Sequence, residues 1–291
     1  MREFDEKSIT RAVIERLSEC SDPRFKSVMS SLVTHLHDFV REVQLTEAEW
    51  ATAIQFLTDV GKTCTDQRQE FILLSDTLGV SVLVITLNHP ADQGSAESTV
   101  LGPFYWEGAP DLPRGSNLAK GVEGEPAFYS GRVLGADGLP LENALLDIWS
   151  GNGDGYYDMQ LPEETGMKAR GKIRTDADGR YWFRSIRPTF YAVPTDGPVG
   201  RMLRKMGRHP YRPGHIHMIV SAAGYLPVTT HLFIAGSDYL DSDAVFGVKE
   251  SLVAQFDRHV PGIGPEGERV DTPFYTVNYD FRLRPAAAGG A

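Results

Sequence analysis

The pair His215-Ile-His217 is the segment whose residue types and spacing most directly suggest chemistry. On a β-strand, residues two apart project from the same face, so both imidazoles would point the same way. Two neutral imidazoles on one face supply half of the ligands of a mononuclear metal site. Histidines at this spacing also occur in cores and on surfaces, so the pair indicates a metal only together with further donors.

Two further segments place tyrosines in loops rich in glycine and proline. Residues 149–158 end a predicted strand and include the neighbours Tyr156 and Tyr157, and residues 187–194 include Tyr191 between two prolines. Adjacent residues of an extended chain face opposite ways, so only one of Tyr156 and Tyr157 can face a given site. Phenolate is a hard anionic donor, and two phenolates with two imidazoles favour Fe(III) over softer metals. A single tyrosine with a hydrogen-bonded hydroxyl would otherwise be ordinary packing.

Taken together, these segments resemble the intradiol ring-cleavage dioxygenases, and the resemblance covers most of the chain. The family's first tyrosine ligand follows a Trp by eight residues, and its second follows a proline by three. Its Arg-Pro-x-His-x-His element falls on Arg212 and the two histidines. The resemblance implies one Fe(3+) per subunit, with four ligands: Tyr157, Tyr191, His215 and His217.

Within the family, this chain is most similar to the branch that acts on hydroxyquinol. The similarity rests on residues 71–80, 101–104, 193–200 and 239–249. It implies that O2 opens the ring of hydroxyquinol between its adjacent hydroxyls, to 3-hydroxy-cis,cis-muconate or its tautomer maleylacetate, in aromatic degradation. The implied substrate-binding residues are Leu73, Asp76, Val100, Gly102, Pro103, Phe104, Val193 and Arg212.

The resemblance also implies roles for single residues. Tyr191 would double as a base for a substrate proton. Arg212 would stabilise negative charge on the ring, or else only fix its loop. His231, which stands where many catechol enzymes of the family carry Gln, would hydrogen-bond the substrate. Asp76 would accept a hydrogen bond from the third hydroxyl at the pocket mouth, or else be an exposed residue at a helix end.

Three other functions fit parts of the same pattern. A catechol or chlorocatechol 1,2-dioxygenase would use the same iron and the same mechanism. A non-catalytic β-sandwich binding module would use the histidines and tyrosines only for packing. A zinc hydrolase would use His215 and His217, but the sequence lacks a third ligand in a His-Glu-x-x-His pattern.

The elements that must position these residues change in type near residue 90. In residues 25–43, apolar side chains recur at the three- and four-residue spacing of an amphipathic helix. Thr46 with Glu49 predicts the start of a second helix, which Gly61 would end. A third helix is expected from about residue 66 to 78, closed by Gly79.

Short β-type runs dominate the rest of the chain, separated by glycine-rich turns. The sequence therefore predicts an α+β protein, with a helical dimerisation domain at 1–90 and an antiparallel β-sandwich catalytic domain at 91–291. The helical part carries more apolar surface than its own packing requires, so we expect a homodimer. The resemblance also implies a phospholipid at the dimer interface. The predicted strands are 128–134, 144–149, 171–175, 181–186, 215–221, 228–235 and 275–283.

Composition excludes several classes of function. The 291 residues are 41% hydrophobic and 23% charged, as in ordinary globular proteins. A net charge of −10 argues against nucleic acid as a partner, and we expect the basic residues of 201–212 to form a solvated loop. We expect a cytoplasmic protein for three reasons. The chain has only two cysteines, its first residues are charged, and its apolar run at 80–87 is too short for a membrane span.

Overall fold

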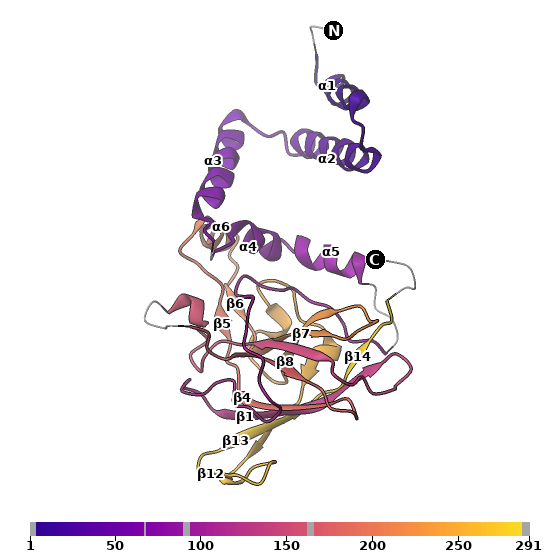
Figure 1. Cartoon of the computed structure of the whole chain (residues 1–291). Coiled ribbons are helices and arrows are strands. Elements are labelled where there is room, and N and C mark those ends of the chain that lie inside the picture. Colours follow the sequence, from indigo (N-terminus) through magenta and orange to yellow (C-terminus); the bar gives the residue numbers. More distant parts are fainter. Residues whose placement is uncertain (1–3, 67, 90–93, 162–165, 287–291) are drawn as a thin grey trace. The chain divides into compact units, whose positions relative to one another are not determined.

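The structure is a computed structural model that describes residues 4–66, 68–89, 94–161 and 166–286. The chain divides into two compact units between Asp59 and Val60. Helices come first in the chain and strands follow (Figure 1). This order confirms the predicted α+β class.

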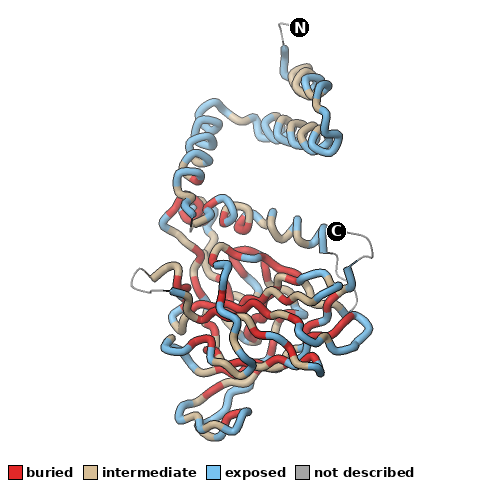
Figure 2. The backbone as a smooth tube through the Cα atoms, in the orientation of Figure 1, coloured by how far each residue is buried: buried red, intermediate tan, exposed pale blue. Residues whose placement is uncertain are grey.

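The first unit is helical. Asp22 caps α2 by accepting a hydrogen bond from the Phe25 backbone N–H at 3.0 Å, and proline takes the first helical position. The apolar stripe predicted for residues 25–43 lies on α2, and no residue of this helix is buried; Phe25 is 55% exposed (Figure 2). The elements that begin in this unit are α1 (Ile9–Glu15), η1 (Arg16–Glu19), α2 (Pro23–Glu42) and α3 (Glu47–Thr63).

A reciprocal cap begins α3 where the sequence predicts it. The Glu49 backbone N–H donates to the Thr46 hydroxyl at 3.3 Å, and the Glu49 carboxylate accepts from the Thr46 backbone N–H at 2.9 Å. Two backbone donors that a helix start leaves free are thereby satisfied. The helix continues through Gly61 to Thr63, two residues beyond its predicted end.

Two short helices, α4 (Glu70–Thr77) and α5 (Val80–Asn88), open the second unit at 78° to each other. Gly79 lies between them with φ +74°, a conformation that glycine adopts at little cost. Gly79 thus ends α4 as predicted, but α4 begins at Glu70 and α5 was not predicted. No single helix of the described ranges is long and apolar enough to span a membrane; α4 and α5 reach that length only as a bent pair.

The strands form two five-stranded sheets and two short ribbons. One sheet has the order β10-β13-β1-β14 with β4 on β1, and the other has the order β3-β2-β7-β8-β9. The strands are β1 (Pro126–Gly135), β2 (Leu145–Trp149), β3 (Arg170–Arg174), β4 (Arg180–Ile186), β5 (Tyr191–Ala192), β6 (Tyr211–Arg212), β7 (His215–Ser221), β8 (Val228–Ile234), β9 (Val253–Ala254), β10 (Asp257–His259), β11 (Gly262–Ile263), β12 (Arg269–Val270), β13 (Phe274–Asn278) and β14 (Phe281–Leu283).

The sheets are mixed, which corrects the antiparallel prediction. Strands β13 and β14 run parallel to β1, and β9 runs parallel to β8. A strand that returns after a long connection is free to pair in the parallel direction, whereas a hairpin enforces the antiparallel one. The predicted strand 275–283 is broken at Tyr279 and Asp280, so its two halves pair with successive parts of β1.

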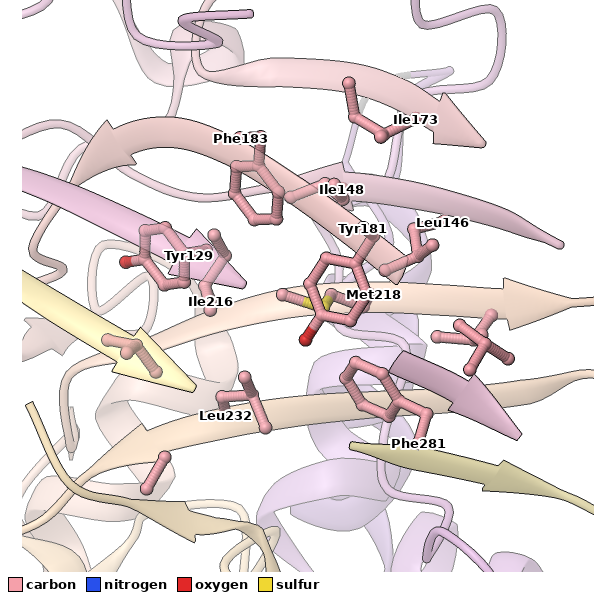
Figure 3. Packing of buried hydrophobic residues seen from close by; sticks show 14 of the residues in the cluster. Tyr129, Leu146, Ile148, Ile173, Tyr181, Phe183, Ile216, Met218, Leu232 and Phe281 are labelled. Atoms are coloured by element: carbon pink, nitrogen blue, oxygen red, sulfur yellow. The ribbon is translucent and has the colours of Figure 1, made fainter. Parts of the chain in front are cut away.

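The hydrophobic core lies between the two sheets. Alternation along β7 sends Ile216 and Met218 into the core and turns His215 and His217 to the opposite face. The chemistry therefore belongs to the outer face of the β3-β2-β7-β8-β9 sheet, not to the sandwich interior. Figure 3 shows the core residues Tyr129, Leu146, Ile148, Ile173, Tyr181, Phe183, Ile216, Met218, Leu232 and Phe281.

The basic residues of 201–212 do not form a solvated loop, so that expectation was wrong. Their first part belongs to helix α6 (Pro198–Lys205), whose Val199 N–H donates to the Glu70 carboxylate at 3.1 Å. Glu70 is fully buried and also binds Arg68, so a carboxylate caps this helix start. The last residue of the cluster, Arg212, is only 1% exposed.

Candidate metal centre

Three neighbouring strands assemble the surroundings of His217. In the sheet register, His217 of β7 is opposite Trp149 of β2 on one side and His231 of β8 on the other. The Trp149 ring stacks on His217 with 4.7 Å between centroids, and the His231 ring is 4.1 Å away. His217 is therefore held between two rings and is almost fully buried.

The structure selects Tyr157 over Tyr156. Tyr157 is 1% exposed, whereas Tyr156 is 53% exposed, as expected for neighbours in extended backbone. The ring of Phe104 stacks on Tyr157 at 4.5 Å, which fixes the phenol. The Tyr157 hydroxyl then lies 2.8 Å from His217 Nε2.

The ribbon β5–β6 brings Tyr191 and Arg212 to the same place. The two residues are directly paired in this ribbon, and Arg212 Nη1 donates to the Tyr191 hydroxyl at 3.4 Å. The same Nη1 lies 3.2 Å from His215 Nε2, which is 3.1 Å from His217 Nε2. The four predicted ligands thus come from three separate parts of the chain and meet at one point.

These distances fit a shared ion. Donor atoms bound to one ion at roughly 2 Å lie roughly 3 Å apart when their bonds are at right angles. His215 Nδ1 lies 2.7 Å from the Pro213 carbonyl oxygen, so the hydrogen-bond network assigns its proton to Nδ1 and leaves the Nε2 lone pair for a metal. His217 Nδ1 is buried and has no hydrogen-bond partner among the described residues.

The electrostatics of the cluster also favour a highly charged cation. Burial lowers the pKa of His215 to about 3 and holds the pKa of His217 well below its usual value, so both imidazoles are neutral. Burial raises the pKa of the Tyr157 and Tyr191 phenols, while the Arg212 guanidinium opposes this for both. A highly charged cation would supply the charge needed to ionise two buried phenols, and two phenolates with two imidazoles suit iron.

His231 lies beside the ligands with a different geometry. Its donor nitrogen lies within 4.8 Å of those of His215 and His217, and its ring stacks on His215 at 4.6 Å with only 20° between the planes. Lone pairs in two nearly parallel ring planes do not converge on one ion. The Val100 backbone is near enough to one ring nitrogen of His231 to raise its pKa slightly against the effect of burial, and the other nitrogen has no hydrogen-bond partner among the described residues. The residue therefore offers an unused donor or acceptor next to the metal ligands.

A cavity of about 380 Å³ reaches this cluster only through Phe104, and none of the four candidate ligands is among the residues that line it. Leu73, Pro103 and Phe104 line it, and Phe104 separates it from the Tyr157 ring. Gly102 approaches His217 so closely that an added Cβ would be 3.2 Å from His217 Cε1. Val100 and Val193, the two other apolar residues predicted for the pocket, are buried and are not among the residues that line this cavity.

Asp76 is only 2% exposed, so the interpretation as an exposed residue at a helix end was wrong. It lies in the last turn of α4, and the chain turns at Gly79 so that Ser81 of α5 hydrogen-bonds its carboxyl. Burial raises the pKa of Asp76, and Ser81 and the nearby Arg212 guanidinium oppose this rise. Asp76 thus lies near Arg212 and Asp243 and is not among the residues that line the 380 Å³ cavity.

Sequence reasoning missed two buried carboxylates next to the candidate ligands. Asp243 accepts from Arg212 Nε at 3.0 Å and from Arg212 Nη2 at 3.2 Å. Asp158, which follows Tyr157, accepts from Arg170 Nε at 2.7 Å and Nη2 at 2.6 Å. Both carboxylates lie in segments that carry the family resemblance, but nothing in their local sequence indicates the arginine that each one binds.

Comparison with protein-family models places the chain in a known class. Residues 100–285 match the model described as "Dioxygenase", and residues 22–96 match the model described as "Catechol dioxygenase N terminus". Together with the fold and the two-tyrosine, two-histidine cluster, these matches show that the chain belongs to the intradiol ring-cleavage dioxygenases.

Individual relatives are similar over nearly the whole chain. The hydroxyquinol 1,2-dioxygenase of a Rhizobium species is 49% identical over 282 residues, which cover 96% of each chain. The 6-chlorohydroxyquinol 1,2-dioxygenase of Cupriavidus pinatubonensis is 46% identical over 98% of this chain and 99% of its own. The solved structure of the hydroxyquinol 1,2-dioxygenase of Pseudomonas putida superposes with a TM-score of 0.89 at 44% identity, over 97% of this chain and 99% of that one.

Proposed function

We propose that this protein is a hydroxyquinol 1,2-dioxygenase that uses one Fe(III) per subunit. The observation that carries the proposal is a buried cluster of donor atoms. The Tyr157 hydroxyl lies 2.8 Å from His217 Nε2, which lies 3.1 Å from His215 Nε2, and Arg212 links the Tyr191 hydroxyl to them. The names of relatives at 46% and 49% identity support the choice of substrate. One ring and one O2 give one ring-opened dicarboxylate, so the oxygen atoms balance.

Each of the four ligands contributes to holding the ion. Tyr157, Tyr191, His215 and His217 would bind the metal through two anionic and two neutral atoms. Bound ferric iron supplies a Lewis acid for the two adjacent substrate hydroxyls and couples the ring electronically to dioxygen. The cavity bounded by Leu73, Pro103 and Phe104 lies on the other side of Phe104 from Tyr157 and would give a small aromatic ring a path toward the metal.

Tyr191 and Arg212 handle proton and charge. The Tyr191 oxygen takes up a proton from a substrate hydroxyl, and Arg212 Nη1, at 3.4 Å, stabilises that oxygen while it is anionic. Because Arg212 is buried, its positive charge acts strongly on negative charge that develops on the ring. His231 presents a buried, unpaired nitrogen that hydrogen-bonds the bound substrate.

Asp76 distinguishes hydroxyquinol from catechol in this proposal. Its buried carboxyl lies near Arg212 and accepts a hydrogen bond from the third hydroxyl of the substrate. A site that must hydrogen-bond a hydroxyl discriminates strongly against the analogue without it, because a buried polar group is then left unpaired.

The helical residues 1–90 would form a dimerisation domain and residues 91–291 the catalytic domain. The uncovered apolar face of α2 supports self-association, because six of its large apolar side chains are at least 43% exposed. A phospholipid at that interface stays a prediction. Analytical ultracentrifugation tests the homodimer, and lipid extraction followed by mass spectrometry tests the bound lipid.

Oxygen uptake with hydroxyquinol and catechol in parallel tests the activity. Hydroxyquinol autoxidises, so the assay includes an enzyme-free reaction and the Tyr157→Phe variant. We expect faster uptake with hydroxyquinol, maleylacetate as the product and one O2 consumed per ring. Preference for catechol would retain the iron site but remove the role of Asp76. Colourless protein without iron, after expression in iron-replete cells, would instead favour a binding module.

A further inference from the structure

Asp243 holds one whole edge of the Arg212 side chain. Its two oxygens accept from Nε at 3.0 Å and from Nη2 at 3.2 Å, and both side chains are nearly inaccessible to solvent. A guanidinium is a rigid planar fork, so fixing one edge fixes the direction of the remaining nitrogen. That nitrogen is Nη1, which points at the Tyr191 hydroxyl and at His215 Nε2.

The backbone around Asp243 fixes its carboxylate in turn. The Val245 N–H donates to Oδ1 at 3.3 Å, and the Gly247 N–H donates to Oδ2 at 2.9 Å. With the two arginine bonds, each carboxylate oxygen accepts two hydrogen bonds, which uses its acceptor capacity. The carboxylate therefore has one stable orientation.

Gly247 is needed for this arrangement because no other side chain has room there. A Cβ on Gly247 would lie 2.9 Å from Arg212 Nη2, 3.1 Å from the Thr99 hydroxyl and 3.2 Å from Asp243 Oδ2. The Gly247 carbonyl also accepts from the Thr99 hydroxyl at 2.7 Å, which ties the loop to the segment before Gly102. The loop 243–247 is thus shaped around the ion pair.

We propose that Asp243 is a positioning residue for ring opening, which aims Arg212 Nη1 at the Tyr191 oxygen. The inference rests on the proposed function and deepens it by adding a residue that touches neither substrate nor metal. Stability alone is a weak reason for a buried ion pair, because apolar residues of similar volume often serve as well. The direction of Nη1 supplies the functional reason.

Asp243→Asn tests this role, since asparagine keeps the volume but turns an N–H donor toward an arginine or backbone N–H. We expect kcat to fall about 100-fold, as for the loss of one oriented donor, while KM changes less than about threefold. The visible phenolate-to-iron band of the iron-loaded protein should move to longer wavelength, because a phenolate oxygen that loses a hydrogen bond has lone pairs of higher energy. Iron content should stay near one per subunit.

A control variant with a similar loss of stability separates a loss of Arg212 positioning from simple destabilisation. Thr175 is buried at the far end of β3 from Arg170, where its hydroxyl donates to the Leu141 carbonyl oxygen and accepts from the Ala144 N–H. Thr175→Val should lower the melting temperature without moving the band or the ratio of kcat to KM. If Asp243→Asn does not fold, Gly247→Ala keeps both charges while crowding the pair, and the band should move the same way by a smaller amount.

The outcomes separate the inference from the function. A band shift to shorter wavelength would mean that Asp243 only neutralises Arg212, and an unshifted band would mean a structural role; either result overturns the positioning role. Wild-type protein that shows neither a visible band nor oxygen uptake would count against the proposed function itself.

Discussion

Gly102 gives a sharp test of how the fold places a metal ligand. Its φ is +78°, it precedes Pro103, and a Cβ added to it would lie 3.2 Å from His217 Cε1. Gly102→Ala therefore introduces backbone strain and a steric contact with one of the proposed iron ligands. The His217 ring has little room to retreat, because Trp149 stacks on it at 4.7 Å and His231 lies at 4.1 Å.

The two effects have different sizes. An alanine in the left-handed region costs about 1 kcal/mol in the free energy of unfolding, and the following proline adds to this cost because it restricts the residue before it. The steric contact requires a displacement of a few tenths of an ångström, which tilts the imidazole and moves Nε2 from its place beside Tyr157. Mutations that disturb the residues supporting a metal ligand typically lower metal affinity about 10- to 100-fold.

The assay compares Gly102→Ala with Gly224→Ala, where φ is +81° and no atom lies within 4 Å of the added Cβ. Urea unfolding should show destabilisation of both variants. Only Gly102→Ala should lose iron faster to a chelator, with a weaker visible band. Equal iron retention in the two variants would refute the reasoning that Gly102 makes room for His217.

Three further predictions concern the same site. Tyr157→Phe should lose most of the visible colour and the oxygen uptake, whereas Tyr156→Phe should lose neither, because only Tyr157 is buried against His217. Asp76→Leu, which removes the acceptor proposed for the third hydroxyl, should raise the ratio of kcat/KM for catechol to that for hydroxyquinol by about tenfold, the effect of one hydrogen bond. Iron-free protein should lose stability below pH 6.5, by up to about 1.4 kcal/mol per pH unit for each of three imidazoles, measured by urea unfolding.

The sign of the pH effect follows from burial. Burial lowers the pKa of His215 to about 3 and holds the pKa values of His217 and His231 well below the usual range, so the folded state resists protonation. The unfolded chain takes up protons first as the pH falls through about 6.5. The stabilisation is complete above that pH and is lost progressively toward pH 3. A free energy of unfolding that stays constant from pH 7 to 5.5 would contradict these pKa shifts.

The sequence by itself determined the features that depend on local periodicity. Alternation with a period of two places His215 and His217 on one face. It also shows that only one of Tyr156 and Tyr157 can face the site, and the family resemblance implied that this is Tyr157, which is the buried one. The strands β1 to β4, β7 and β8 were predicted within two residues for the same reason. The short strands β5, β6 and β9 to β12 have only two or three residues each, too few to show a period.

Only the tertiary structure decided which distant residues meet. The register of β7 with β8 sets His231 beside His217, and the loop after β8 brings Asp243 to Arg212. The turn at Gly79 buries Asp76, which its position at a helix end suggested was exposed. Side-chain period is a property of a short segment, whereas such contacts depend on strand order, register and loop closure, which no single segment encodes.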